Sequence, residues 1–141
     1  TIRDVLPFMQ RGWPVLVDLA KTDLVYPSSC VTSSRSFVKA EPKTVTAFLN
    51  TYVSAIQRIK KDPKLAERTL IKWLKEKESA NLTKSVEAFV RLFKAAPYVP
   101  GAGIENVLKD LAHQRPVPKE FIGHPELFRD NGPLDRVVAK S

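Results

Sequence analysis

The pattern of apolar and polar positions divides the chain into a short mixed part and a long helical part. Residues 14–19 (PVLVDL) form a nearly continuous apolar run with β-branched side chains, which is typical of a short buried strand. Residues 28–34 are rich in Ser, Thr, Cys and Val and predict a second strand. A short amphipathic helix over residues 4–11 precedes both. The N-terminal part is therefore expected to mix helix and strand.

Beyond residue 34, apolar side chains recur at steps of three and four, which indicates helices. Two of them begin with an acidic residue and a proline, Glu41-Pro42 and Asp62-Pro63. Proline suits the first helical position because its missing N–H would lack a partner there in any case. The predicted helices cover residues 34–40, 42–59, 63–74, 81–93, 104–113, 118–122 and 133–139. The predicted fold class is α/β and helix-rich, with two or so short strands followed by a bundle of about five helices.

Size and composition are those of a globular protein. The 141 residues fit one domain, and 43% hydrophobic with 27% charged residues is not the composition of a disordered chain. No apolar run approaches the roughly 18 residues of a transmembrane helix. The first residues, with Arg3 and Asp4, do not read as a signal peptide. Because the chain begins with Thr1 rather than Met, we expect it to be processed or cut from a longer protein.

The chain is strongly basic, with a formal net charge of +8 and a pI near 9.7. Such a charge suits nucleic acid or an acidic membrane surface. The densest basic region is residues 58–77, with cations at Arg58, Lys60, Lys61, Lys64, Arg68, Lys72, Lys75 and Lys77. Acidic residues are interleaved, and no aromatic series, glycine-rich RNA signature or zinc spacing accompanies the cations. A solvated helix face is therefore favoured over nucleic-acid binding.

The sequence carries little that points to catalysis. Its lone cysteine, Cys30, excludes a disulfide within one chain and a cysteine-based zinc cluster, and it is interpreted as a small buried residue of the second strand. No glycine-rich phosphate loop, HExxH motif or nucleophile elbow occurs. His113 and His124 fall at a helix end and in a turn. The sequence thus predicts a protein that is not an enzyme, and it indicates no catalytic residue, metal ligand or cofactor.

The aromatic residues fall into two groups. Tyr52 and Trp73 lie on the apolar stripes of their helices and are expected in the core. Tyr26 and Tyr98 lie in loops beside prolines, where an amphipathic ring commonly lines a cleft or an interface. The two loop tyrosines are the aromatic candidates for a binding role.

An ordered series of short motifs links the first predicted strand to the second long helix. It consists of Gly12-Trp13-Pro14, Val15-Leu16-Val17-Asp18-Leu19, Tyr26-Pro27-Ser28-Ser29, Ser34-Arg35-Ser36-Phe37-Val38-Lys39, Pro42-Lys43-Thr44-Val45, Phe48-Leu49 and Asp62-Pro63-Lys64-Leu65-Ala66. In order and spacing the series resembles the second half of substrate-binding proteins of ABC transporters, in the branch for nitrate, sulfonates, taurine and thiamine precursors. The resemblance covers most of residues 12–74 and continues loosely to about residue 130.

This resemblance implies a partial periplasmic-binding-protein-like II fold. Residues 1–34 would be the end of the second lobe and its crossover strand, and residues 35–141 the helical C-terminal region. The implied function is the solute-binding component of an ABC importer, periplasmic or extracytoplasmic, with an anionic or heteroaromatic small molecule held in a cleft between two lobes. Tyr26 would offer a ring face to the solute, and Ser28 and Ser29 would offer hydroxyl or backbone donors.

The implied partners follow from the same resemblance. The chain has about half the usual length of the family, so the N-terminal half of the parent protein would supply the other wall of the cleft, and an ABC permease would receive the solute. Because a truncated sheet leaves strand edges and apolar helix faces uncovered, we expect the isolated chain to form a homodimer or a swapped dimer. The alternative is a basic helical module, residues 58–77, that binds nucleic acid or an acidic partner.

Overall fold

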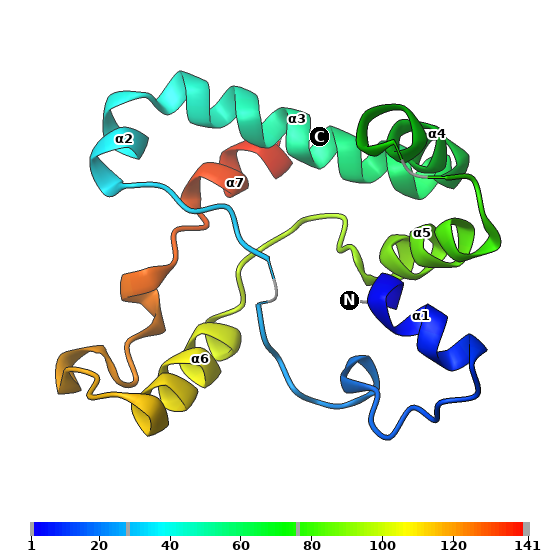
Figure 1. Ribbon diagram of the computed structural model, residues 1–141. Helices are drawn as coiled ribbons and strands as arrows, with labels where there is room; N and C mark the ends of the chain where they lie inside the picture. The colour runs from blue at the N-terminus through cyan, green and yellow to red at the C-terminus, as the bar shows by residue number, and fades with distance from the viewer. Residues whose placement is uncertain (1, 28, 76, 140–141) are drawn as a thin grey trace. The chain divides into compact units, whose positions relative to one another are not determined.

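The computed structural model describes residues 2–27, 29–75 and 77–139, and within these ranges every regular element is a helix (Figure 1). Seven α-helices and three short 3-10 helices lie in this part of the chain. The α-helices are α1 (Ile2–Gln10), α2 (Arg35–Ala40), α3 (Pro42–Lys61), α4 (Pro63–Leu74), α5 (Ala80–Leu92), α6 (Gly101–Gln114) and α7 (Gly132–Val138). The 3-10 helices are η1 (Leu19–Lys21), η2 (Lys119–Phe121) and η3 (Pro125–Phe128).

The predicted α/β fold class is wrong, because the described residues contain no strand. The apolar run of residues 14–19 is mostly irregular and ends in η1, and Leu16 is 90% exposed. The described part of residues 28–34 is also irregular, and Cys30 is exposed rather than buried in a strand. A strand requires the backbone of a second strand to pair with. Neither segment finds such a partner among the described residues.

The predicted helix starts are largely confirmed. Ser34 accepts a hydrogen bond from the Phe37 amide at 3.1 Å and caps α2. Asp62 caps α4 in the same way, accepting from the Leu65 amide at 3.2 Å. Pro42 is the first residue of α3, as expected. These capping contacts involve residues within one helical turn, which is why residue type alone predicts them.

The chain divides into two compact units, and α3 contributes residues to both. The first unit consists of Thr1–Asp18 and Thr51–Pro97, and the second of Leu19–Asn50 and Tyr98–Ser141. The predicted division after residue 34 comes from the family resemblance and stays a prediction.

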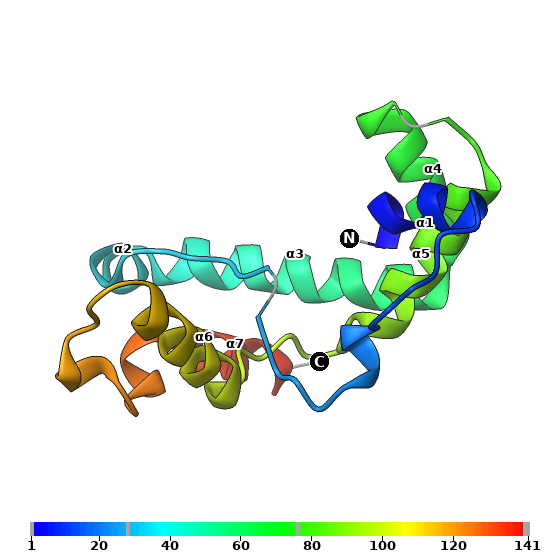
Figure 2. The ribbon, with the colours of Figure 1, turned by 60° about the horizontal axis from the view of Figure 1, so that its bottom comes forward.

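Helix α5 is at the centre of the first unit, where it contacts both α1 and α4 (Figures 1 and 2). The buried apolar side chains of this unit are Val53 and Ile56 of α3 and Val86 of α5. The Lys60 ammonium joins α3 to α5 by donating to the Val90 carbonyl at 2.9 Å. Helix α1 is joined to α5 by a hydrogen bond in which the Gln10 side-chain amide donates to Asn81 Oδ1 at 2.6 Å.

The second unit is built around α6 and the C-terminal segment. Helix α6 contacts η3, and the buried apolar side chains are Leu108 of α6 with Leu134 and Val137 of α7. Among the helices of the described residues, none has the length and apolar character needed to cross a membrane.

Candidate functional site

The candidate site is the segment of residues 22–27, called here the Tyr26 segment, which lies in the second unit. Tyr26 is 48% exposed, so a large part of its ring is accessible. Ser29, two residues beyond the segment, is also exposed. Ser28, the third predicted ligand residue, lies outside the described residues. The structure therefore leaves Tyr26 and Ser29 open to a binding partner.

Helix α6 holds the Tyr26 segment in place from both sides of the tyrosine. The Asn106 side-chain amide donates to the Val25 carbonyl at 2.9 Å. Gly103 is buried, and a Cβ added there would lie 3.0 Å from Cδ of Pro27. The hydrogen bond fixes the residue before Tyr26, and the close approach fixes the residue after it. The ring is consequently presented from an anchored backbone even though the segment has no regular structure.

The beginning of the Tyr26 segment is a hydrogen-bonded turn. The Thr22 hydroxyl donates to the Leu19 carbonyl at 2.8 Å, and the same hydroxyl oxygen accepts from the Leu24 amide at 3.4 Å. A threonine side chain of this kind takes the place of a backbone partner in a turn. The segment thus begins at a defined point after η1.

A second anchored loop precedes α6 and carries Tyr98. Asn131 accepts from the Val99 amide at 3.1 Å and donates to the Val99 carbonyl at 3.2 Å. The Arg129 guanidinium donates to the same carbonyl at 3.2 Å. The Tyr98 hydroxyl is hydrogen-bonded to Asp135, and this bond is the main reason why the pKa of Tyr98 is raised above 10.0; burial and the nearby negative charge act in the same direction.

His124 and Glu126 are in contact on the C-terminal segment of the second unit. His124 Nδ1 lies 2.9 Å from a carboxylate oxygen of Glu126. A backbone hydrogen bond at Glu126, followed by the His124 contact, lowers the pKa of the Glu126 carboxyl below 4.5. Both side chains are exposed. The pair is therefore a surface contact of small energetic weight.

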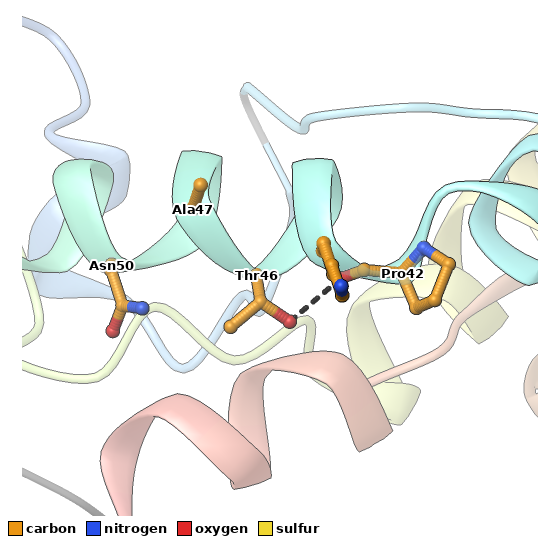
Figure 3. A pocket seen from close by; sticks show the side chains of 5 residues that line it. Pro42, Thr46, Ala47 and Asn50 are labelled. Carbon is orange, nitrogen blue, oxygen red and sulfur yellow. Dashed lines mark hydrogen bonds between the residues drawn. The ribbon is translucent and has the colours of Figure 1, made fainter.

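Neither of two hollows found among the described residues of the second unit is lined by Tyr26 or Ser29. One, of about 380 Å³, lies along a single face of α3 and is lined by Pro42, Lys43, Thr46, Ala47 and Asn50 (Figure 3). The Thr46 hydroxyl there donates to the Pro42 carbonyl at 2.8 Å (Figure 3). The other, of about 310 Å³, is lined by Leu108, Leu111, Arg115, Pro116, Val117, Pro118, Phe121 and Phe128.

The two hollows differ in chemistry. The α3 hollow offers an ammonium, a hydroxyl that is already engaged and a carboxamide, all from one helix. The hollow at the end of α6 is walled by apolar side chains and by the edge-to-face pair of Phe121 and Phe128, whose centroids are 5.2 Å apart, with Arg115 as its cation. Among the described residues no group of His, Cys, Asp and Glu side chains could hold a metal ion.

Comparisons with known proteins add no relative. No protein family, no curated protein and no solved structure was found to match this chain. The site is accordingly judged on its own geometry and on the motifs of the sequence. Tyr26 and Ser29 are accessible, and Tyr26 is held by α6 through its two neighbours.

Sequence reasoning missed the anchoring residues Gly103, Asn106 and Asn131. A signal for the first was present, since two glycines fall in one turn at the start of a helix (GAG, residues 101–103), and such glycines often permit close approach of another backbone. No comparable signal marked the two asparagines. Their partners, Val25 and Val99, are 81 and 32 residues away in the sequence.

Proposed function

We propose that the chain is part of the solute-binding component of an ABC importer and acts outside the cytoplasm. The observation that carries the proposal is the ordered motif series, whose helix-forming members lie at observed helix starts. Ser34 caps α2, Pro42 opens α3 and Asp62 caps α4. The proposal does not depend on the strands that the sequence predicted.

In this role Tyr26 and Ser29 form one wall of the solute site. The ring face of Tyr26 stacks on a heteroaromatic solute or covers the apolar part of an organic anion. Ser29 donates a hydroxyl or backbone hydrogen bond. Because Asn106 and Gly103 hold the backbone on both sides of Tyr26, little conformational entropy is lost when a solute binds. The solute is released unchanged, so the role is transport and not catalysis.

The exposed apolar side chains support a further polypeptide partner. Trp13, Val15, Leu16 and Val17 are all exposed in the first unit, and Leu24 and Val25 are exposed in the second. Neighbouring apolar residues left open to water commonly mark a surface that another chain segment covers. We assign this cover to the N-terminal half of the parent protein, and the ABC permease is the partner that accepts the solute.

Thermal-shift screening of the complete gene product tests the proposal. The panel contains nitrate, alkyl sulfonates, aromatic acids and pyrimidines, each at a high excess. A solute at about 100 times its Kd stabilises the folded state by about 2.7 kcal/mol, a shift that is readily measured. If no member of the panel raises the melting temperature and no binding heat is measured by calorimetry, the solute-binding proposal fails.

Matched substitutions test the site assignment separately. Tyr26→Ala removes the ring, whereas Tyr26→Phe keeps the ring and removes the hydroxyl. Ser29→Ala is compared with Ser33→Ala, which changes a neighbouring exposed serine that the proposal does not use. We expect weaker solute binding in Tyr26→Ala and Ser29→Ala, and unchanged binding in Ser33→Ala. Unchanged affinity in both site variants would show that the solute binds elsewhere.

The second candidate is a basic helical module that binds nucleic acid or an acidic partner through residues 58–77. The observation that favours it is the exposure of Lys64, Arg68 and Lys72 along α4. Binding of this kind weakens steeply as salt rises, because counterions compete for the phosphates. Absence of binding to duplex and single-stranded nucleic acid at low salt would remove the nucleic-acid form of this candidate.

A further inference from the structure

Helix α4 carries a row of cations along one face. Lys64, Arg68 and Lys72 follow at intervals of four residues, which places them one above the other on the helix surface, and all three are exposed. Lys75, which ends the helix, and Lys77 are exposed as well. Asp62 is paired with Arg68 at 3.3 Å at the opposite end of the helix. Around the end of α4, residues 72–78 hold three lysines, Lys72, Lys75 and Lys77, against two carboxylates, Glu76 and Glu78, so their net charge is +1.

Two large apolar side chains are exposed at the same end of α4. Trp73 is 71% exposed and Leu74 is 61% exposed, so the expectation that Trp73 belongs to the core is wrong. Earlier residues of the apolar stripe, Leu65 and Leu70, are half-buried. The apolar stripe therefore continues beyond the part of α4 that is packed. The Lys72 ammonium lies 5.0 Å from the centroid of the Trp73 ring.

We infer that the C-terminal end of α4 docks on an anionic lipid surface. Tryptophan is favoured at the boundary between headgroups and acyl chains, because its ring is apolar and its indole N–H needs a polar partner. Lysines beside it reach anionic headgroups with their ammonium groups while their stems cover apolar surface. Trp73 and Leu74 enter the boundary, and Lys72, Lys75 and Lys77 neutralise the headgroups. This docking would keep the chain at the membrane, and it is independent of solute binding.

The same residues fit a lipid surface better than a nucleic acid. Single-stranded nucleic acid is held by several aromatic side chains that alternate with cations along a groove. Here one exposed aromatic ring and a leucine stand together at a helix end, with Lys72, Lys75 and Lys77 close to them in the sequence. A leucine side chain gains nothing from a phosphate backbone, but it gains from an acyl boundary.

Vesicle binding of the chain with Trp13→Phe tests the inference. This background leaves Trp73 as the only tryptophan of the chain, so its fluorescence reports directly on the docking residue. We expect a shift of emission to shorter wavelength and co-sedimentation with vesicles that contain phosphatidylglycerol, and neither with pure phosphatidylcholine. Each lysine at an anionic surface is worth about fivefold in partitioning, so Lys72→Glu/Lys75→Glu should weaken binding at least about 25-fold.

A second double variant supplies the control. Lys94→Glu/Lys119→Glu makes the same change in net charge at exposed positions outside α4. It should keep vesicle binding within a few-fold, and far-ultraviolet circular dichroism checks that both variants are folded. Equal loss in the two variants would show attraction by net charge alone and would overturn the inference. So would binding to single-stranded DNA or polyglutamate without binding to the anionic vesicles.

Discussion

Replacing Gly103 by alanine tests how α6 holds the Tyr26 segment. The new Cβ would lie 3.0 Å from Cδ of Pro27 and 3.2 Å from Cγ of Pro100. Carbon atoms in ordinary contact are about 3.5–4.0 Å apart, so both prolines must move by roughly half an ångström. Proline rings cannot rotate away as a flexible side chain does, so the backbone itself has to shift.

The expected magnitude follows from two opposing effects. Overpacking of a well-packed contact costs about 1–3 kcal/mol, whereas alanine in place of glycine in a helix gains at most about 1 kcal/mol. We therefore expect Gly103→Ala to lower the free energy of unfolding by about 1 kcal/mol. For a chain of this size that corresponds to a melting temperature lower by about 4 °C.

Gly101→Ala, two residues earlier in the same helix, is the matched control. A Cβ at Gly101 would meet the Arg129 guanidinium, with Cζ at 3.2 Å. The exposed end of an arginine side chain moves at little cost, and the Val99 carbonyl that it bonds also accepts from Asn131. Urea denaturation followed by circular dichroism measures both variants. Gly101→Ala should be as stable as the original chain or slightly more stable. If Gly103→Ala is equally stable, the close approach of Pro27 to α6 does not hold the segment, and the reasoning is refuted.

Three further outcomes are expected. Asn131→Ala removes both hydrogen bonds to Val99 and should cost about 1–3 kcal/mol in urea denaturation, because the half-buried Val99 amide loses its partner, whereas the Val99 carbonyl keeps the bond from Arg129. The pKa of Tyr98 in the folded state is raised above 10.0, so its bond to Asp135 stabilises the fold fully below pH 10, and this stabilisation is lost as the pH rises through the folded pKa. In urea denaturation between pH 9 and 11, the free energy of unfolding should therefore fall, and Tyr98→Phe should lack this fall. The isolated chain should self-associate in light scattering, and Leu16→Lys should reduce this, because Leu16 is 90% exposed.

Each of these outcomes has a result that would contradict it. Full stability of Asn131→Ala would mean that water replaces the lost bonds to the 98–100 loop. If the free energy of unfolding of Tyr98→Phe falls with rising pH as it does in the original chain, another group causes the fall. A monomer at high concentration would remove the expected homodimer or swapped dimer.

The local parts of the fold could be predicted from the sequence, and the parts that need a distant partner could not. The sequence predicts helix starts at Ser34 and at Asp62-Pro63, and at both places the side chain bonds an amide only three residues away. The strand over residues 14–19 failed because a strand exists only when another strand pairs with it. The prediction that Trp73 lies in the core was wrong for a related reason. An apolar stripe shows which side of a helix packs, but it does not show where along the helix the packing stops.

In the candidate site, too, the features that depend on neighbouring residues could be predicted and those that depend on distant residues could not. Tyr26 was recognised as an accessible loop tyrosine because a neighbouring proline and a turn can be read directly. Its anchoring was not foreseen, because Asn106 reaches Val25 across 81 residues of sequence. An asparagine inside a helix is usually a solvated residue, so its type alone gives no hint of this role.

The amide pair between Gln10 and Asn81 has a consequence for the order in which the first unit folds. It joins α1 to α5 across 71 residues, whereas α4 and α5 are joined by a short connection. Long loops close at a greater entropic cost, so α4 and α5 can associate early and α1 docks late. An element that docks last through exposed amides is also the first to open. In native-state hydrogen exchange, the amides of α1 should therefore exchange well before those of α5.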